Sequence, residues 1–125
     1  MHTVLIIEDD HNILLMIKRM LESFGFDIKL ASNGLEGLEF FRKFDVDLVI
    51  TDIIMPEKEG LEIIREMRRE RPELKIIAMS GGGKLSASNY LETAKIFGAA
   101  SILEKPFTKK QMVEAVQDSL AASNK

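Results

Sequence analysis

Short apolar runs alternate with amphipathic segments along the chain, and this alternation constrains the fold more than any other feature. The apolar runs have strand length, whereas the segments between them repeat apolar residues at helical spacing. The predicted strands are 3–7, 26–31, 47–52, 75–79 and 100–103. Strands that alternate with helices form a parallel sheet with helices on both faces. The sequence therefore predicts an α/β fold with a doubly wound sheet of five parallel strands and five helices.

Local signals mark the ends of the predicted helices. Asn33 with Glu36, and Thr108 with Gln111, have the spacing of a helix-start capping pattern. Gly25 ends the first helix, and a fourth helix is predicted at 90–98. The helix that precedes Pro72 is expected to point its arginines into solvent; these are Arg65, Arg68, Arg69 and Arg71.

Length and composition favour one domain that spans residues 1–125. The net charge is -3 with both signs well mixed, so no direct contact with nucleic acid is expected. The chain has no cysteine and no apolar stretch of the roughly 18 residues that a membrane span needs. We therefore expect a cytoplasmic protein that does not insert into a membrane.

Polar residues follow four of the predicted strands. Glu8 and Asp9 follow the first strand, Asp52 closes the third, and Ser80 and Lys105 follow the fourth and fifth. In a parallel sheet all carboxyl ends lie at one edge, so these side chains are expected to converge. Carboxylates about 4 Å apart repel by about 4 kcal/mol per pair at an effective dielectric of about 20. A hard divalent cation would relieve this repulsion, and oxygen ligands suit Mg²⁺.

Several of these residues also have ordinary structural explanations when taken singly. Acidic residues before a helix are favoured by the helix dipole, and we expect that role for Asp10. His11 is expected to be an exposed residue at the helix start. The run from Gly81 to Lys84 suggests a phosphate-binding loop, but Ala78 and Leu85 stand where that motif needs a glycine and a hydroxyl residue. We therefore expect the stretch from Ser80 to Gly83 to be a loop.

The combination of these residues over essentially the whole chain resembles the receiver domains of two-component response regulators, the CheY-like family. The resemblance implies a flavodoxin-like sheet with strand order 2-1-3-4-5. It also implies that Asp52 accepts a phosphoryl group, while Ser80 contacts that group and Lys105 pairs with it. Mg²⁺ would be held by Glu8, Asp9, Asp52 and the backbone carbonyl of Ile54. The resemblance implies a signalling switch that promotes its own phosphorylation and is not a dedicated enzyme.

The resemblance further implies a cis peptide bond between Lys105 and Pro106. The expected partners are a cognate histidine kinase or phosphotransfer protein and a downstream effector. The effector is expected to bind the fourth helix, fifth strand and fifth helix, around Tyr90, Lys95, Ile102 and Lys109. Ile102 stands where many receivers have an aromatic switch residue.

The lifetime of the phosphoryl group depends on the residues beside the acceptor. Hydrolysis needs a water oriented by polar side chains. Ile54 and Gly82 occupy the two positions best placed for this, and neither side chain can hydrogen-bond water. We therefore expect slow autodephosphorylation.

Three other classes of protein share part of this pattern. A phosphatase-like hydrolase with an aspartate nucleophile would need Asp-x-Asp after the first strand, whereas this chain has Glu8, Asp9 and Asp10. A flavodoxin-like binding module would need a phosphate loop after that strand. A degenerate receiver that acts as a phosphorylation-independent interaction module remains the main alternative.

Overall fold

The computed structural model describes residues 2–52, 59–81 and 101–122. In chain order its elements are β1 (Thr3–Ile7), α1 (His11–Glu22), β2 (Asp27–Ala31), α2 (Gly34–Lys43), β3 (Leu48–Asp52), α3 (Glu59–Glu70), β4 (Lys75–Gly81), β5 (Ser101–Lys105) and α5 (Lys109–Ala122). The helix predicted at 90–98 lies outside the described residues. Within the described ranges, no helix combines the length and apolar character that crossing a bilayer would require.

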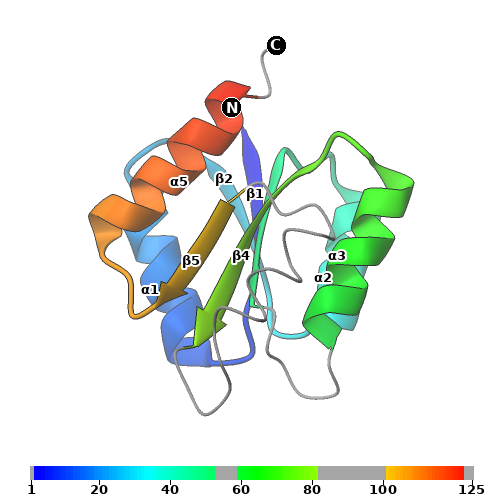
Figure 1. The fold of residues 1–125 in the computed structure, drawn as a ribbon, viewed down its shortest axis with the longest axis horizontal. Coiled ribbons are helices and arrows are strands. Elements are labelled where there is room, and N and C mark those ends of the chain that lie inside the picture. The colour runs from blue at the N-terminus through cyan, green and yellow to red at the C-terminus, as the bar shows by residue number, and fades with distance from the viewer. Residues whose placement is uncertain (1, 53–58, 82–100, 123–125) are drawn as a thin grey trace.

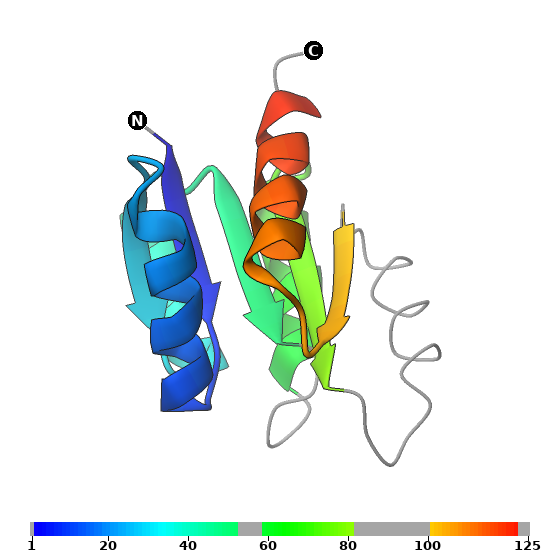
Figure 2. The same ribbon diagram turned by 90° about the vertical axis from the view of Figure 1, so that its left-hand side faces the viewer.

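The five strands form one parallel sheet in the order β2-β1-β3-β4-β5. The arrowheads of β1, β3, β4 and β5 in Figures 1 and 2 point the same way, so the carboxyl ends of these strands share one edge. The predicted fold class and strand order are therefore confirmed.

Helices cover both faces of the sheet. Figure 1 shows α1 and α5 on one side of the strands and α2 and α3 on the other. Alternate residues of β1 pack against the helices on the two faces of the sheet, because successive side chains of a strand point to opposite faces. Val4 and Ile6 belong to the apolar cluster with α1 and α5, whereas Leu5 and Ile7 belong to the cluster with α2 and α3. All four are fully buried, as a sheet covered on both faces requires.

The predicted helix starts are formed by side-chain caps. Asp10 Oδ1 accepts hydrogen bonds from the backbone N–H groups of Asn12 and Ile13 at the start of α1. At the start of α5, the Gln111 N–H donates to Thr108 Oγ1 and the Thr108 N–H donates to Gln111 Oε1. These bonds satisfy N–H groups that a helix start otherwise leaves unpaired. Asp10 therefore lies at the helix start, as predicted for a charge that the helix dipole favours, and its side chain also caps α1.

Strands β4 and β5 differ from the predicted bounds. The prediction ended the fourth strand at Met79 and began a loop at Ser80, but β4 continues through Gly81. The fifth strand was predicted to end at Leu103, but β5 continues through Lys105. The two extensions pair with each other, Ser80 with Glu104 and Gly81 with Lys105. Pairing with a neighbouring strand thus extends the ladder beyond the apolar run that marks each strand in the sequence.

The arginines of α3 are not uniformly solvated. Arg68 Nη1 donates to the carbonyl oxygens of Pro72, at 2.7 Å, and Leu74. Arg71, just after α3, donates from Nη1 to the Val46 carbonyl at 2.7 Å. Arg65 and Arg69 are exposed, as predicted, whereas Arg68 and Arg71 are only partly exposed and also bind backbone carbonyls near the ends of elements.

Candidate functional site

Four neighbouring strands bring the predicted site residues to one edge of the sheet. Glu8 and Asp9 directly follow β1, Asp52 is the last residue of β3, and Lys105 is the last residue of β5. Ser80 is the penultimate residue of β4, one position beyond Met79, which pairs with Asp52. The strand order places β1, β3, β4 and β5 side by side, so five residues spread over the chain meet at their carboxyl ends.

Three carboxylates form a compact cluster at this edge. One oxygen from each of Glu8, Asp9 and Asp52 lies within 4.8 Å of the others. Glu8 and Asp52 are buried, whereas Asp9 is exposed. The residues present fit a hard divalent cation, since the cluster offers oxygen ligands only and one side open to water.

Lys105 Nζ lies against two of these carboxylates. It is 2.5 Å from Glu8 Oε1 and 2.8 Å from Asp52 Oδ2. Burial by itself would lower the pKa of this ammonium, but the hydrogen bonds to Asp52 and Glu8 outweigh burial and the pKa is raised. Lys105 is therefore charged at neutral pH and lies beside the candidate acceptor.

Glu8 has its two oxygens engaged in different directions. Oε1 faces Lys105, and Oε2 accepts a hydrogen bond from the Asp10 backbone N–H at 3.2 Å. Burial raises the pKa of Glu8 to about 7, and the charge of Asp52 adds to this effect while Lys105 and the Asp10 N–H oppose it. The sequence did not predict the direct pair between Glu8 and Lys105. The contact joins residues 97 positions apart, so no local pattern in the sequence indicates it.

Ser80 is fully buried, and its Oγ has no hydrogen-bond partner among the described residues. A buried hydroxyl without a partner is uncommon in native proteins and often marks a functional position. The neighbouring Thr51 differs, because its Oγ1 donates to the Asp52 carbonyl at 3.1 Å. Ser80 is thus the one site hydroxyl in the described region that is free to contact an incoming group.

Several predicted residues fall outside the described residues, namely Ile54, Gly82, Tyr90 and Lys95. The peptide bond between Lys105 and Pro106 is cis, as predicted. Ile102 is partly buried in β5, and Lys109 is exposed at the start of α5. His11 is exposed at the first position of α1, which confirms its predicted place.

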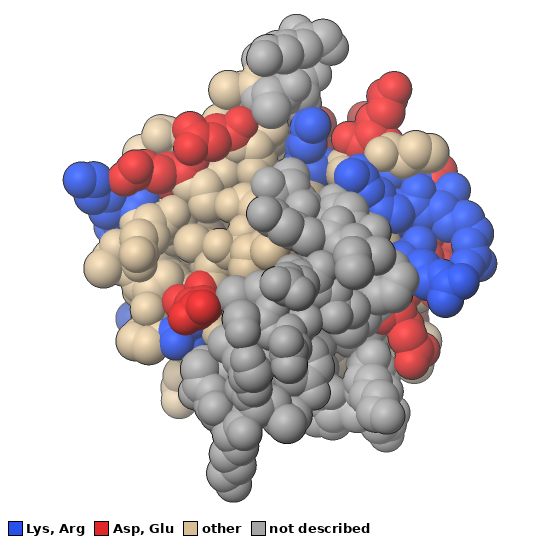
Figure 3. Space-filling model, viewed as in Figure 1, with Lys and Arg blue, Asp and Glu red and all other residues tan. Residues whose placement is uncertain are grey.

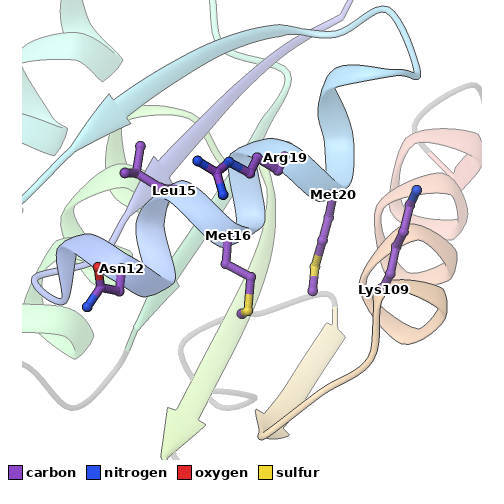
Figure 4. Close-up of a pocket in the computed structure, with 6 residues that line it drawn as sticks. All are labelled: Asn12, Leu15, Met16, Arg19, Met20 and Lys109. Carbon is purple, nitrogen blue, oxygen red and sulfur yellow. The ribbon is translucent and has the colours of Figure 1, made fainter.

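A hollow of about 500 Å³ lies between α1 and the start of α5 (Figure 4), and the sequence did not predict it. It is lined by Asn12, Leu15, Met16, Arg19, Met20 and Lys109. The signal that could have found it is the presence of apolar residues outside the buried stripe of α1, which consists of Leu14, Ile17 and Leu21. None of the lining residues belongs to the acidic cluster.

The charged surface around α3 mixes both signs. Figure 3 shows basic side chains gathered over this helix with acidic ones beside them. Arg42 of α2 contributes to this mixture, because its guanidinium pairs with Glu66 at 3.0 Å and Glu70 at 2.5 Å. The mixture agrees with the modest net charge of -3.

Comparison with known proteins identifies the family. The family model for the response regulator receiver domain matches residues 4–117. The sensor kinase CckA of Brucella abortus is 34% identical over 120 residues, which are 94% of this chain and 12% of that protein. The DNA-binding transcriptional regulator NtrC of Azospirillum brasilense is 33% identical over 121 residues, which are 94% of this chain and 24% of that protein. The chain thus spans a minor part of the length of these relatives.

Solved structures agree with this similarity. A response regulator receiver domain protein from Clostridium thermocellum is 32% identical, with a TM-score of 0.88 over 99% of this chain and 98% of that one. A CheY-like receiver domain protein from Methanospirillum hungatei is 28% identical, with a TM-score of 0.87 over 99% of this chain and 97% of that one. The matched span includes every residue of the site described above. The chain belongs to the response regulator receiver domain family.

Proposed function

We propose that this receiver domain is a phosphoacceptor switch in which Asp52 accepts the phosphoryl group with the help of Mg²⁺. The observation that carries the proposal is the position of Lys105 Nζ, 2.8 Å from Asp52 Oδ2. It stands in a cluster that also holds Glu8 and Asp9. A nucleophilic carboxylate, an ammonium and a cluster of oxygen ligands are the groups that phosphoryl transfer needs.

Each residue has one role in the proposed transfer. A carboxylate oxygen of Asp52 attacks the phosphorus of the donor, and the bond from phosphorus to the donor's leaving group breaks in line with that attack. Lys105 offsets negative charge on the phosphoryl oxygens as they separate from the donor. The unpaired hydroxyl of Ser80 can then donate a hydrogen bond to the transferred group. Recruitment of Ser80 would couple the charge change at Asp52 to the end of β4.

The metal site proposed for Mg²⁺ consists of Glu8, Asp9, Asp52 and the backbone carbonyl of Ile54. Bound Mg²⁺ supplies a positive charge shared by donor and acceptor oxygens. The all-oxygen donor set of the three carboxylates supports this choice of metal.

The proposed partners are a histidine kinase or phosphotransfer protein as donor and an effector protein as target. We place the effector surface on the predicted fourth helix, β5 and α5, since these flank Ser80 and Lys105 in the sequence. Residues 1–125 are proposed to form a single domain. The cytoplasmic location and the slow loss of phosphate remain predictions.

The proposal is tested by intact-mass measurement after incubation with a small acyl phosphate and Mg²⁺. The wild type should gain one phosphoryl group, and Asp52→Asn should gain none. Asp118→Asn is a matched control, because it removes an exposed carboxylate of α5 and should be labelled like the wild type.

Two results would contradict the proposal. Labelling that persists in Asp52→Asn would show that another residue is the acceptor. A folded wild type that stays unlabelled with several donors would favour the degenerate, phosphorylation-independent module.

A further inference from the structure

The outer side of α1 has a row of apolar residues that the core does not use. Met16 and Met20 are four residues apart and extend from the same side of the helix (Figure 4), and Phe24 follows just beyond the end of α1. Met16 and Phe24 are 39% and 41% exposed, and they are two of the three large apolar residues that are exposed in the described part of the chain. Helix α1 therefore presents an apolar surface to solvent as well as to the sheet.

This row borders the hollow of about 500 Å³ between α1 and the start of α5. The apolar lining of the hollow consists of Leu15, Met16 and Met20. Methionine side chains are flexible and polarizable, so they adapt to apolar groups of different shape. The volume falls within the range of roughly 300–1,000 Å³ that is typical of sites for small molecules. The hollow therefore has the size and the lining to hold a small apolar group.

Two cations without an ionic partner line the same hollow. Arg19 comes from the last turn of α1 and Lys109 from the start of α5, and both are exposed. Neither forms an ion pair within the described ranges, and the Lys109 ammonium lies only near the Phe24 ring, 6.0 Å from its centroid. Lys18 differs, because its ammonium pairs with Glu22 at 3.9 Å. No carboxylate is among the described residues that line the hollow, so its two positive charges are not offset.

We propose that this hollow binds an amphiphilic anion with a single chain, such as a medium-chain alkyl carboxylate. The alkyl chain lies against Leu15, Met16 and Met20, and the carboxylate accepts hydrogen bonds from Arg19 and Lys109. Contact with the alkyl chain removes apolar surface from water, and hydrogen bonds between charged groups are stronger than those between neutral groups. None of these five residues belongs to the acidic cluster, so the proposal goes beyond phosphoryl transfer.

Charge and shape favour this ligand over two other occupants. A second copy of the chain in a two-fold contact would place the same two cations opposite each other, and like charges repel. An anionic membrane would attract the two cations, but the chain as a whole carries a net charge of -3, and a flat bilayer cannot fill a hollow. A free anion with one chain meets neither obstacle.

The proposal is tested by NMR of methionine methyl groups labelled with ¹³C, during titration with octanoate below its micelle-forming concentration. The Met16 and Met20 signals, assigned from Met16→Leu and Met20→Leu, should shift together. The dissociation constant should be about 1–10 mM, as expected for a ligand of this size at an exposed site. The Met67 signal should stay in place, because Met67 is fully buried in the apolar cluster on the other face of the sheet.

The role of the cations is tested by removing them one at a time. Arg19→Gln and Lys109→Gln should each weaken octanoate binding about two- to fivefold, as the loss of an exposed ion pair would. Both variants should bind octanol, which has the same chain length without the charge, about as well as the wild type does. Lys110→Gln is the matched control, because Lys110 is exposed on α5 beside Lys109 but does not line the hollow. It should bind octanoate like the wild type.

Three results would overturn the proposal. Octanoate that leaves the Met16 and Met20 signals unshifted, well above the expected dissociation constant, would exclude the site. Equal affinity for octanoate in the wild type, Arg19→Gln and Lys109→Gln would show an apolar patch without preference for an anion. Signal changes that appear only at high protein concentration, or only with anionic lipid vesicles, would assign the hollow to a second copy or to a membrane surface. None of these measurements uses a phosphodonor, so their outcome does not depend on phosphorylation of Asp52.

Discussion

At the scale of single residues, Gly37 packs closely against the sheet. This glycine is buried in α2, and a Cβ added to it would overlap Cδ1 and Cγ1 of Ile7 in β1. A larger residue at this position would therefore require the Ile7 side chain or the helix to shift.

We predict that Gly37→Ala lowers the free energy of unfolding by about 1 kcal/mol. Overpacking lowers the free energy of unfolding by about 1–3 kcal/mol. Alanine in place of glycine inside a helix raises it by about 1 kcal/mol, because alanine has the higher helix propensity. Ile7→Val removes the Cδ1 atom, so Gly37→Ala should be less destabilising in that background. Denaturant unfolding of the two single variants and the double variant measures this coupling, and strictly additive losses would contradict the steric explanation.

Substitution of Ser80, unlike that of Gly37, is not expected to destabilise the fold. Its buried hydroxyl has no partner in the described part of the chain, so Ser80→Ala should unfold at the same temperature as the wild type or higher. Thr51→Val is the matched comparison, because it removes the bond from Oγ1 to the Asp52 carbonyl and should lose about 1 kcal/mol. A clear loss of stability in Ser80→Ala, measured by thermal unfolding without Mg²⁺, would mean that the hydroxyl has a structural partner.

At the scale of elements, Arg42 links α2 to α3. Its guanidinium forms hydrogen bonds with both oxygens of Glu70, and these bonds lower the pKa of that carboxyl. A carboxyl whose pKa is lower in the folded state stabilises the fold above its unfolded pKa, and this contribution disappears as pH falls through the folded pKa. The link between the two helices is therefore expected to weaken in acid.

We predict that Arg42→Met is less stable than the wild type at pH about 7, and that the difference narrows below pH about 4, where glutamate becomes protonated. The loss at neutral pH should be small, because the pair is exposed. Denaturant unfolding at both pH values checks the stability, and carboxyl NMR should show the Glu70 pKa rising in the variant. Arg69→Met is the control, because Arg69 is exposed on α3. An equal loss of stability in Arg69→Met would mean that the change in net charge, and not the contact between Arg42 and Glu70, causes the effect.

At the scale of the whole molecule, three strands contribute charged groups to one edge, so ligand binding there should stabilise the entire fold. We predict that Mg²⁺ raises the melting temperature, with stabilisation of about 2.7 kcal/mol at a concentration 100 times the dissociation constant. Asp9→Asn should lose most of this rise, whereas Asp118→Asn should keep it. Calorimetric melting across millimolar Mg²⁺ is the measurement, and an unchanged midpoint in the wild type would contradict the metal site.

Much of the fold was predictable because its signals are local. The apolar run of β1, the helical spacing of Leu14, Ile17 and Leu21, and the Thr108 cap each depend on residues close in sequence. The ends of β4 and β5 were not predictable in this way. Ser80 and Lys105 belong to those strands because each segment pairs with the other, and such pairing leaves no mark in composition.

The sequence by itself determined the order of elements, the parallel sheet and the group of polar residues that gather at its carboxyl edge. The apolar spacing of each element and the polar residues that follow each strand can be identified from residues close in sequence. A parallel sheet then brings the carboxyl ends of its strands to one edge. Only the tertiary structure decided that Glu8 shares the Lys105 ammonium with Asp52, that Ser80 Oγ is buried without a partner among the described residues, and that Gly37 lies against Ile7. These contacts join residues far apart in the chain, and their distances depend on how the strands and helices pack.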